Sequence, residues 1–456
     1  MNVLRTASLL LGCSLLAAPA SAQIACDSTA CDRVIDASER RVDGAADAAG
    51  STLCVRASDT PIGSLEIRDV SGTADAPVRV IPCGGVLRIG AGSSTDAISI
   101  VRSRHLQLSG GDETAIRIEG GDGYSMGIAV RGCTEHLELD HIEVTGTSYT
   151  ALRNHVADDA CVERSGFSVH HLYVHDVGGE GMFLGLNSGT SPNLLRDVEI
   201  YENRIERTGY QGIKVGTTVV NAIVRDNVVI EPGARDVGGE DTGITGSARE
   251  WRIEGNVVVR SRASCAFLSG GTIDLVNNVF VGCGGPGATF NGAPTRVRIA
   301  HNTFVRVGGE GVRWWGGSPT GSTFANNLFL DHPDAGLGPT DAEIWTIAGN
   351  LETTIDDARI VDPVDPDAAG YADVATPPFS IGLDSPARDG GDSSLLDVVP
   401  TDILGRPRDA TPDVGAFEAI VPLPDAGPAS PDAGAPEEHD DAGSARGDDA
   451  SASSPD

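Results

Sequence analysis

Lys214 is the only lysine of the chain, and it lies in the stretch Gly-Tyr-Gln-Gly-Ile-Lys-Val-Gly at residues 209–216. A lysine amine gives up its proton readily when it is desolvated or close to another cation, so it can act as a base. Tyr210 can act as an acid, and Gln211 can bind a polar substrate. The glycines and apolar residues of the stretch fit a repeating strand, so these three side chains are the ones left for chemistry.

Elimination on a uronic acid is the reaction that these residue types favour. It needs a group that neutralises the substrate carboxylate, a base for the C5 proton and an acid for the leaving oxygen. Arg153 is the candidate for neutralisation, and Lys214 or His155 is the candidate base. Tyr210 is the candidate acid, which completes the set for a lyase.

Nearby carboxylates and aromatic rings widen the chemistry. Glu180, Glu240 and Asp241 could hold calcium, which prefers oxygen ligands, and the ion would then neutralise the substrate. Glu180 with Asp241 could instead form the carboxylate pair of a glycoside hydrolase, at a separation of about 5–9.5 Å. Phe183 and Trp315 offer faces for stacking on sugar rings.

Each of these residues also has a structural alternative. Lys214 can be a solvated charge that pairs with Glu180, and Arg153 can be an ion-pair partner. Glu180 lies between glycines and can serve only to bond a turn. Acidic clusters arise easily in a chain with 65 acidic residues. No serine-protease triad, P-loop, dinucleotide fingerprint or zinc-ligand spacing is present in the sequence.

An internal repeat predicts the strands that position these residues. Six segments share an asparagine followed by alternating apolar residues, at steps of 22 to 29 residues: Asn203, Asn227, Asn256, Asn278, Asn302 and Asn327. His141 and His171 are assigned to the same slot in the two preceding repeats and are interpreted as structural. Stacked turn asparagines can bond the backbone of the next repeat, so we interpret the asparagine column as structural.

A period near 24 residues with short alternating strands is typical of one coil of a β-solenoid. We therefore predict an all-β fold, a right-handed parallel β-helix of about ten coils. If Ile213 and Val215 point inward, Lys214 points outward, and equivalent outward residues of successive coils form a column about 4.8 Å apart. This outer column is predicted to contain Arg153, Phe183, Lys214 and Thr245. Of the pair at 314–315, Trp314 is expected to face the core and Trp315 to face outward.

The predicted organisation has five parts. Residues 1–22 read as a secretory signal, with an apolar run and a small-x-small cleavage site; cleavage as a lipoprotein at Cys13 is the alternative. Residues 23–70 are expected to cap the first coil, 71–350 to form the β-helix and 351–421 to form a C-terminal cap. Residues 422–456 are rich in Pro, Asp, Ala and Ser and are expected to stay disordered.

The number of cysteines and the net charge indicate in which compartment the protein acts and which partners it can bind. Eight cysteines remain after the leader, and in an exported chain disulfides are expected. They fall into sequence-near pairs: Cys26 with Cys31, Cys54 with Cys83, Cys133 with Cys161, and Cys265 with Cys283. The net charge is −32, of which the tail contributes −8 (nine acids and one arginine), and the remaining −24 makes nucleic acid an unsuitable partner. No further segment is long and apolar enough to span a membrane, and we expect a secreted or envelope-associated monomer.

Several blocks resemble bacterial secreted proteins with right-handed parallel β-helix repeats, in the pectate-lyase-like superfamily. They are residues 71–78, 174–181, 184–185 and 207–213, and a closing segment with Ser385, Pro386 and Ala387, then Asp402, Gly405, Arg408 and residues 413–418. The family is similar to pectate-lyase-like and chondroitinase-like polysaccharide lyases and to alginate epimerases. The Asp-Pro-His-Asp motif of the epimerases is absent here. The tail is similar to tails of exported myxobacterial proteins.

These observations predict a protein that binds, and as a lyase or hydrolase degrades, an acidic extracellular or envelope polysaccharide through the face of residues 149–245. The alternative is a non-catalytic surface or adhesion solenoid that acts as a rigid spacer. A Lys214 side chain in one groove with Arg153 and a carboxylate favours the enzyme, and a Lys214 surrounded only by water favours the spacer.

Overall fold

The structure is a computed structural model. It describes residues 24–90, 96–111, 114–120, 126–154, 161–188, 191–316, 319–332, 336–339, 343, 345–361 and 379–419. The predicted signal peptide, His155 and the acidic tail therefore lie outside the described residues.

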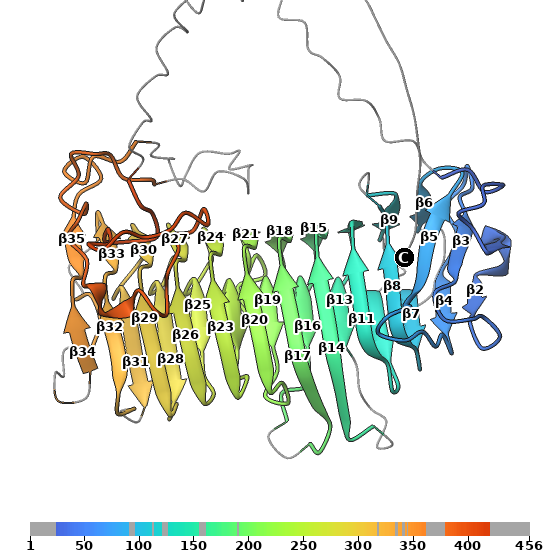
Figure 1. The fold of residues 1–456 in the computed structure, drawn as a ribbon, viewed down its shortest axis with the longest axis horizontal. Coiled ribbons are helices and arrows are strands. Elements are labelled where there is room, and N and C mark those ends of the chain that lie inside the picture. The colour runs from blue at the N-terminus through green and yellow to red at the C-terminus, as the bar shows by residue number, and fades with distance from the viewer. Residues whose placement is uncertain are drawn as a thin grey trace, which may run out of the picture. The chain divides into compact units, whose positions relative to one another are not determined.

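Three parallel sheets run along the described part of the chain, and each coil from β4 (Leu65–Arg68) to β33 (Leu328–Leu330) contributes one strand to each sheet (Figure 1). Sheet A has the order β1 (Arg33–Ile35), β3 (Thr52–Arg56), β5 (Val78–Cys83), β8 (Arg104–Ser109), β11 (Glu135–Asp140), β14 (Glu163–His170), β17 (Leu194–Tyr201), β20 (Asn221–Arg225), β23 (Glu250–Glu254), β26 (Thr272–Val276), β29 (Arg296–Ala300), β32 (Ser322–Ala325) and β34 (Trp345–Ala348). Sheet B has the order β2 (Arg41–Asp43), β4 (Leu65–Arg68), β7 (Asp96–Val101), β10 (Met126–Arg131), β13 (Leu152–Asn154), β16 (Met182–Leu184), β19 (Ile213–Val215), β22 (Ile244–Gly246), β25 (Ala266–Leu268), β28 (Ala288–Gly292) and β31 (Val312–Gly316). Sheet C consists of β6 (Leu87–Ile89), β9 (Ile116–Glu119), β12 (Ile142–Thr145), β15 (Tyr173–Val177), β18 (Arg204–Thr208), β21 (Val228–Ile230), β24 (Val257–Val259), β27 (Val279–Val281), β30 (Thr303–Val305), β33 (Leu328–Leu330) and β35 (Leu351–Thr353). Two short 3-10 turns, η1 (Ala37–Glu39) and η2 (Ser393–Leu395), lie outside the sheets. All pairings between these strands are parallel, and neighbouring strands of a sheet come from successive coils. This arrangement confirms the predicted parallel β-helix.

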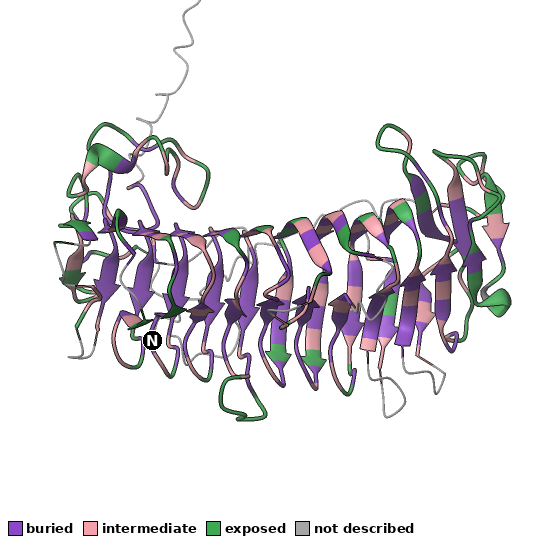
Figure 2. Cartoon of the chain, turned by 90° about the horizontal axis from the view of Figure 1, so that it is seen from below, coloured by how far each residue is buried: buried purple, intermediate pink, exposed green. Residues whose placement is uncertain are grey.

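The core fills the space enclosed by the three sheets, and Figure 2 shows buried residues along the strands throughout the stack. Inward side chains are mostly valine, isoleucine and leucine, which fit a pleated surface and pack on the equivalent residue of the next coil. In the later coils Phe280, Phe304 and Phe329 stack in a row, with ring centroids 5.4 and 4.8 Å apart. A coil alone could not bury these side chains, so the stack is the unit of stability.

The asparagine column is a continuous hydrogen-bonded ladder, as predicted. Asn256 Nδ2 donates to Oδ1 of Asn278 at 3.0 Å and to the carbonyl of Val224 at 2.8 Å. Its own Oδ1 accepts from the backbone and side chain of Asn227 at 3.1 and 2.9 Å. The same pattern runs from Asn203 through to Asn350, one step beyond the predicted segments. The buried amides thus satisfy backbone groups that the turn leaves unpaired.

The assignment of His141 and His171 to this ladder was wrong by one residue. His171 pairs with Glu202, because its backbone N–H donates to the Glu202 carbonyl, and Leu172 occupies the asparagine position. His141, His171 and Glu202 each have φ of 52°. They occupy the left-handed turn position that precedes the ladder, where the side chain points away from the core.

Parallel pairing begins at β1, inside the range expected to be a cap. β1 pairs with β3, and β2 pairs with β4. These first coils lack the asparagine signal, which is why the repeat did not reveal them. Disulfides join them instead: Cys26 to Cys83 and Cys31 to Cys54, which corrects the two sequence-near pairs expected there. The pairs Cys133–Cys161 and Cys265–Cys283 are confirmed.

The closing segment, residues 379–419, packs along the side of the later coils. Its Phe379, Val414 and Phe417 form a second apolar cluster with residues of β21 to β33. Arg408 donates to Glu418 Oε1 at 2.6 Å and to Asn277 Oδ1 at 2.8 Å, which ties the segment to a turn of the coils. Gly415 has φ of +98° and lies where a Cβ would contact Thr303, so a side chain would prevent this close approach.

Candidate functional site

The predicted outer column is confirmed by the strand register. Arg153 of β13 pairs with Phe183 of β16, Phe183 with Lys214 of β19, and Lys214 with Thr245 of β22. The flanking Ile213 and Val215 are fully buried in the core. Period-2 alternation therefore places the four side chains of the column on the outer face of sheet B.

Lys214 is nearly buried on this outer face, because residues around it cover the amine. Its Nζ lies 2.7 Å from Glu240 Oε2 and 3.6 Å from Glu180 Oε1. The side chains of Lys214 and Glu180 are 9% and 2% exposed, whereas that of Glu240 is 36% exposed. Glu240 lies in the connection between β21 and β22, and Thr150 donates to the second oxygen of Glu180 at 2.7 Å. Lys214 is consequently an enclosed ion-pair partner of two carboxylates rather than a solvated charge.

The ring of Phe183 carries two cations. The Lys214 amine and the Arg153 guanidinium each lie 5.0 Å from its centroid. A positive charge is attracted to the face of an aromatic ring, and the attraction grows when both groups are desolvated. Phe183 is buried. It therefore serves to hold the two cations close together and offers no free face to a sugar.

Several polar atoms of this patch have no hydrogen-bond partner among the described residues. They are Nε of Arg153, Oε1 of Gln211 and Oγ1 of Thr242, all of them buried. Gln211 Nε2 donates to the Gly239 carbonyl at 2.9 Å, which anchors the β21–β22 connection over the patch. Buried polar atoms are normally paired, so three unpaired ones around a single ion-pair cluster indicate a place where a polar molecule can bind.

Tyr149 also belongs to the site, although it is not among the residues predicted from the sequence. Its ring meets that of Tyr210 edge-to-face, with centroids 5.9 Å apart, although the two residues lie two coils apart. Gly179 lies between them, and a Cβ there would come within 2.9 Å of the Tyr149 ring. Burial, and after it the charge of Glu180, raises the pKa of Tyr149, so its hydroxyl keeps its proton. Tyr149 precedes Arg153 by the same four residues that separate Tyr210 from Lys214, so the repeat spacing carried this signal.

The remaining predicted site residues are more scattered. Glu180, Glu240 and Asp241 were predicted as calcium ligands. Among the described residues, the groups whose ligand atoms all lie within 4.8 Å of one another do not include these three. Trp315 is 51% exposed and lies in β31, three strands beyond Thr245, against Arg313 and Phe267. It is therefore a separate aromatic surface. His155 lies outside the described residues.

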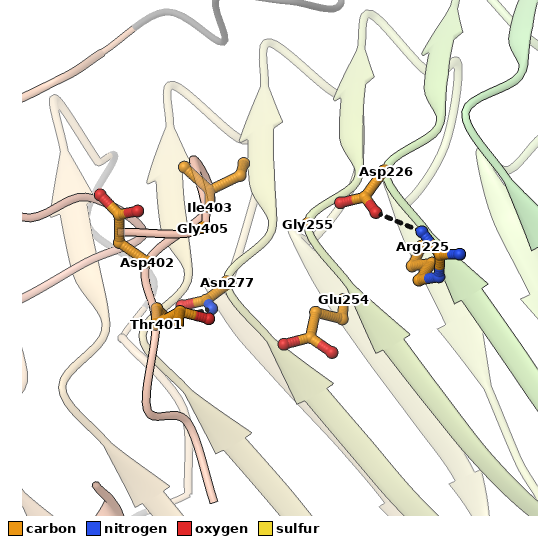
Figure 3. A pocket seen from close by; sticks show the side chains of 9 residues that line it. All are labelled: Arg225, Asp226, Glu254, Gly255, Asn277, Thr401, Asp402, Ile403 and Gly405. Carbon is orange, nitrogen blue, oxygen red and sulfur yellow. Dashed lines mark hydrogen bonds and ion pairs between the residues drawn. The ribbon is translucent and has the colours of Figure 1, made fainter. Parts of the chain in front are cut away.

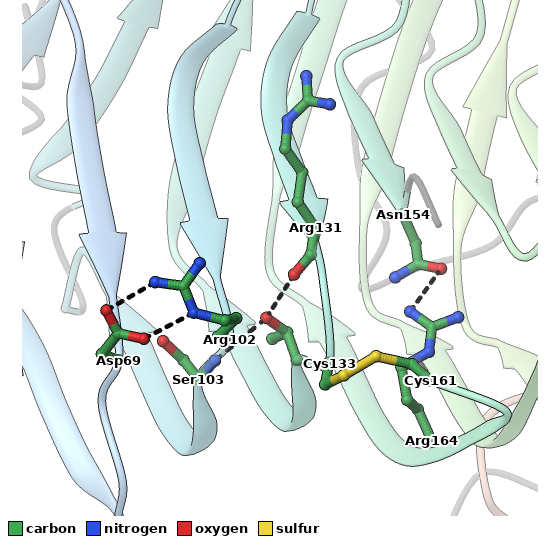
Figure 4. Close-up of a disulfide and its surroundings, with 9 residues drawn as sticks. Asp69, Arg102, Ser103, Arg131, Cys133, Asn154, Cys161 and Arg164 are labelled. Carbon is green, nitrogen blue, oxygen red and sulfur yellow. Dashed lines mark hydrogen bonds and ion pairs between the residues drawn. A yellow bond between two sulfur atoms is a disulfide. The ribbon is translucent and has the colours of Figure 1, made fainter. Parts of the chain in front are cut away.

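A disulfide and a buried arginine lie near the end of the strand that carries Arg153 (Figure 4). Cys133 is bonded to Cys161, and Arg164 Nη1 reaches Asn154 Oδ1 at 3.5 Å. Burial lowers the pKa of Arg164 to about 10. The crosslink connects the turn before β11 to the beginning of β14, which flank β13 in the chain.

A hollow of about 260 Å³ lies between the coils and the closing segment (Figure 3). Arg225, Asp226 and Glu254 line one side, and Thr401 and Asp402 line the other. Burial raises the pKa of Asp226 even though Arg225 donates to it at 2.9 Å. None of the residues predicted for the site lines this hollow.

Comparisons with known proteins support the fold. The sequence profile described as "Right handed beta helix region" matches residues 140–329, which include every coil from Arg153 to Thr245. The predicted right-handed parallel β-helix is thereby confirmed. A search of curated protein sequences found no match. No helix in the described ranges is long and apolar enough to cross a bilayer.

Solved structures of similar fold include carbohydrate-active enzymes. An alginate lyase from Paenibacillus sp. str. FPU-7 is 17% identical with a TM-score of 0.42, covering 62% of this chain and 98% of its own. The PL6 family alginate lyase AlyGC is 14% identical with a TM-score of 0.43, covering 70% of this chain and 51% of its own, so this chain spans about half its length. The GH136 lacto-N-biosidase from Eubacterium ramulus is 10% identical with a TM-score of 0.40, covering 71% and 68%. At these identities and scores the likeness carries no information on substrate.

Proposed function

We propose that this chain is a secreted carbohydrate-active β-helix that binds an acidic polysaccharide on the outer face of sheet B, between Arg153 and Thr245, and cleaves it as a lyase. The observation that carries the proposal is the grouping of Arg153, Lys214 and Glu180 around one buried ring, Phe183. This cluster lies on the outside of the solenoid, where the side chains are not needed to fill the apolar core. An extended polymer fits a wall that repeats about every 4.8 Å.

The residues can be assigned to the steps of β-elimination. Arg153, whose Nε is unpaired, binds the carboxylate of the uronic acid. Lys214 removes the C5 proton, the C4–C5 double bond forms, and Tyr210 or Tyr149 protonates the departing oxygen. His155 is the alternative base.

The ion pair imposes one condition on this scheme. Lys214 donates to Glu240 at 2.7 Å, and a lysine that is donating to a carboxylate is protonated and cannot accept a proton. Glu240 is the more exposed of its two partners. We therefore expect the lysine proton to pass to Glu240 when substrate binds, which leaves the neutral amine that the elimination requires.

The activity test uses the purified secreted chain with pectin, alginate and glycosaminoglycans, each with and without calcium. Lyase action yields unsaturated products that absorb in the ultraviolet, whereas hydrolysis yields reducing ends without that absorbance. Arg153→Ala is expected to lower activity and binding at least tenfold. Arg41→Ala is the matched control, because Arg41 occupies the same column four strands earlier and is exposed. Absence of product and of binding with every polymer would refute the carbohydrate proposal.

A stability cycle separates chemistry from structure at Lys214. Lys214→Met leaves the buried Glu180 without its cation and is expected to lower the free energy of unfolding by about 3 kcal/mol. Lys214→Met with Glu180→Gln removes both charges and should regain much of that stability, as measured by denaturant unfolding. The double variant should still lack activity.

The non-catalytic spacer is the second candidate, and it is favoured by one observation. Both carboxylates near Lys214 already engage its amine, so the cluster can be a purely structural lock. Under this alternative, the double variant would match the wild type in every binding assay and would differ from it only in stability.

A further inference from the structure

A second polar cluster lies on the outer face of sheet A, away from the Lys214 column. Glu138 and Asp140 follow each other on β11 with one residue between them, and His170 ends β14 beside Asp140. One ligand atom from each of the three residues lies within 4.8 Å of the others. The Asp140 side chain is only 4% exposed, although it carries a carboxylate.

Polar neighbours hold the three side chains in place. Gln107 Nε2 donates to Glu138 at 3.2 Å and to Asp140 at 3.1 Å. The ring of His170 is stacked on Tyr201, with centroids 4.6 Å apart. Groups that orient carboxylates and imidazoles in this way are typical of the surroundings of metal ligands.

Nε2 of His170 points at a carboxylate, and its other ring nitrogen has a partner of its own. Glu138 Oε1 lies 3.2 Å from His170 Nε2, and His170 Nδ1 lies 2.8 Å from His171 Nδ1. His171 Nε2 in turn lies 3.3 Å from Glu202. The contact at Nδ1 fixes the orientation of the His170 ring, so Nε2 is directed at the two carboxylates as a metal-binding nitrogen would be.

The geometry points to a divalent transition-metal site formed by Glu138, Asp140 and Nε2 of His170. In this arrangement His170 Nδ1–H donates to His171 Nδ1 and His171 Nε2–H points to Glu202, so every contact is satisfied. The 3.2 Å between Glu138 Oε1 and His170 Nε2 matches the separation of about 3.3 Å between two tetrahedral ligands of zinc at about 2.0–2.1 Å. Imidazole with carboxylates suits zinc and its neighbours better than calcium.

A hollow lies next to one of the three proposed ligands. A hollow of about 220 Å³ adjoins Glu138 and is also lined by Thr73, Pro77 and the stacked rings of His105 and His136. Three protein ligands leave one position of a tetrahedral ion for water or a polar ligand. The site is independent of the proposed function, because it lies on another sheet and shares no residue with the Lys214 patch.

The test is zinc binding by the full secreted chain after treatment with a chelator. Isothermal titration and metal analysis after dialysis should show one equivalent of zinc at micromolar affinity or tighter. His170→Ala should weaken binding at least tenfold, and so should Asp140→Asn, which keeps the side-chain volume. His175→Ala is the matched control: His175 also contacts two carboxylates, Glu143 at 3.3 Å and Asp176 at 2.8 Å, but through opposite ring nitrogens that cannot share one ion.

A spectroscopic measurement reports on the ligands directly. Cobalt substituted for zinc should give the visible absorption of a four-coordinate site, and this absorption should disappear in His170→Ala while far-ultraviolet circular dichroism stays unchanged. Zinc binding that persists in both ligand variants overturns the site. Binding of calcium in place of zinc overturns the metal class, and a chain that binds no metal overturns the proposal.

Discussion

His301, in the later coils, and His171, in the earlier coils, occupy the same turn position of the repeat, but their surroundings differ. His301 and His171 have φ of 54° and 52°, so the backbone is the same. His301 is fully buried under the closing segment and accepts from Asn326 at 2.9 Å. The side chain of His171 is 43% exposed, and its ring stacks on His141 at 4.7 Å.

The difference shows that a repeat position determines the backbone but leaves the surroundings open. In the later coils the asparagine ladder and the closing segment cover this corner, and Asn326 donates both to His301 Nε2 and to the Asp392 carbonyl of the closing segment. In the earlier coils Ile142 and Leu172 replace the ladder asparagine, and the polar groups outside the corner are imidazoles and carboxylates that face one another. The first region is therefore covered by the chain itself, whereas the second is open on its outer side, where we propose the metal site.

Removing the anchor of the covered region should have the largest effect. Arg408→Leu leaves Glu418 and Asn277 without their buried partner and should lower the free energy of unfolding by about 3–5 kcal/mol. Arg388→Leu, at an exposed arginine of the same segment, is the control and should change it by less than about 0.5 kcal/mol. Similar values for the two variants would mean that the closing segment does not stabilise the coils.

Interrupting the ladder should come next. Asn256→Ala removes one amide that makes five hydrogen bonds and leaves buried backbone groups unpaired, at a cost of about 3 kcal/mol in unfolding free energy. Asn221→Ala, on an exposed strand end, should be nearly neutral by the same denaturant titration. A neutral Asn256 variant would show that water replaces the ladder.

The buried histidine should give the covered region a pH dependence. Burial lowers the pKa of His301 from 6.5 to about 3. Between these values the unfolded chain binds more protons than the folded chain, so stability is lost as pH falls through this range, by up to about 1.4 kcal/mol per pH unit. His301→Asn keeps a residue suited to this turn and should flatten that part of the stability curve. An unchanged slope would assign the dependence to carboxylates instead.

The smallest effect is expected at the exposed histidine. His171→Asn removes a half-exposed ring from the surface. It should change the free energy of unfolding of the metal-free chain by less than about 1 kcal/mol, as measured by denaturant titration. A loss as large as that of Asn256→Ala would remove the contrast between the two regions.

The repeating features of this chain could be predicted from its sequence, whereas the non-repeating ones could not. The register of Arg153, Phe183, Lys214 and Thr245 followed from the period alone, because strand alternation and coil length set it. The enclosure of Lys214 did not, because Glu240 comes from a connection whose path no repeat describes. Tyr149 was missed because Gly179, which lets it reach Tyr210, looks like any other turn glycine in the sequence.

The disulfides show the same limit. Cys133–Cys161 and Cys265–Cys283 lie close in sequence and were paired correctly, whereas Cys26 bonds Cys83 across a separation of 57 residues. The strand path around the first coils, which lack the asparagine signal, brings these two sulfurs together. Sequence proximity carries no information about that path.

The sequence by itself determined the coil: which residues turn inward, where asparagines stack, and which side chains share the column of Lys214. These follow from local alternation and a fixed period, which act over a few residues. Tertiary structure alone decided which of those outward positions stay open. Glu240 from a connection covers the one lysine, the closing segment buries His301, and Glu138 and Asp140 lie beside His170. Such environments depend on what packs over a coil from distant parts of the chain, and burial then sets the charge, the pKa and the binding capacity of each side chain.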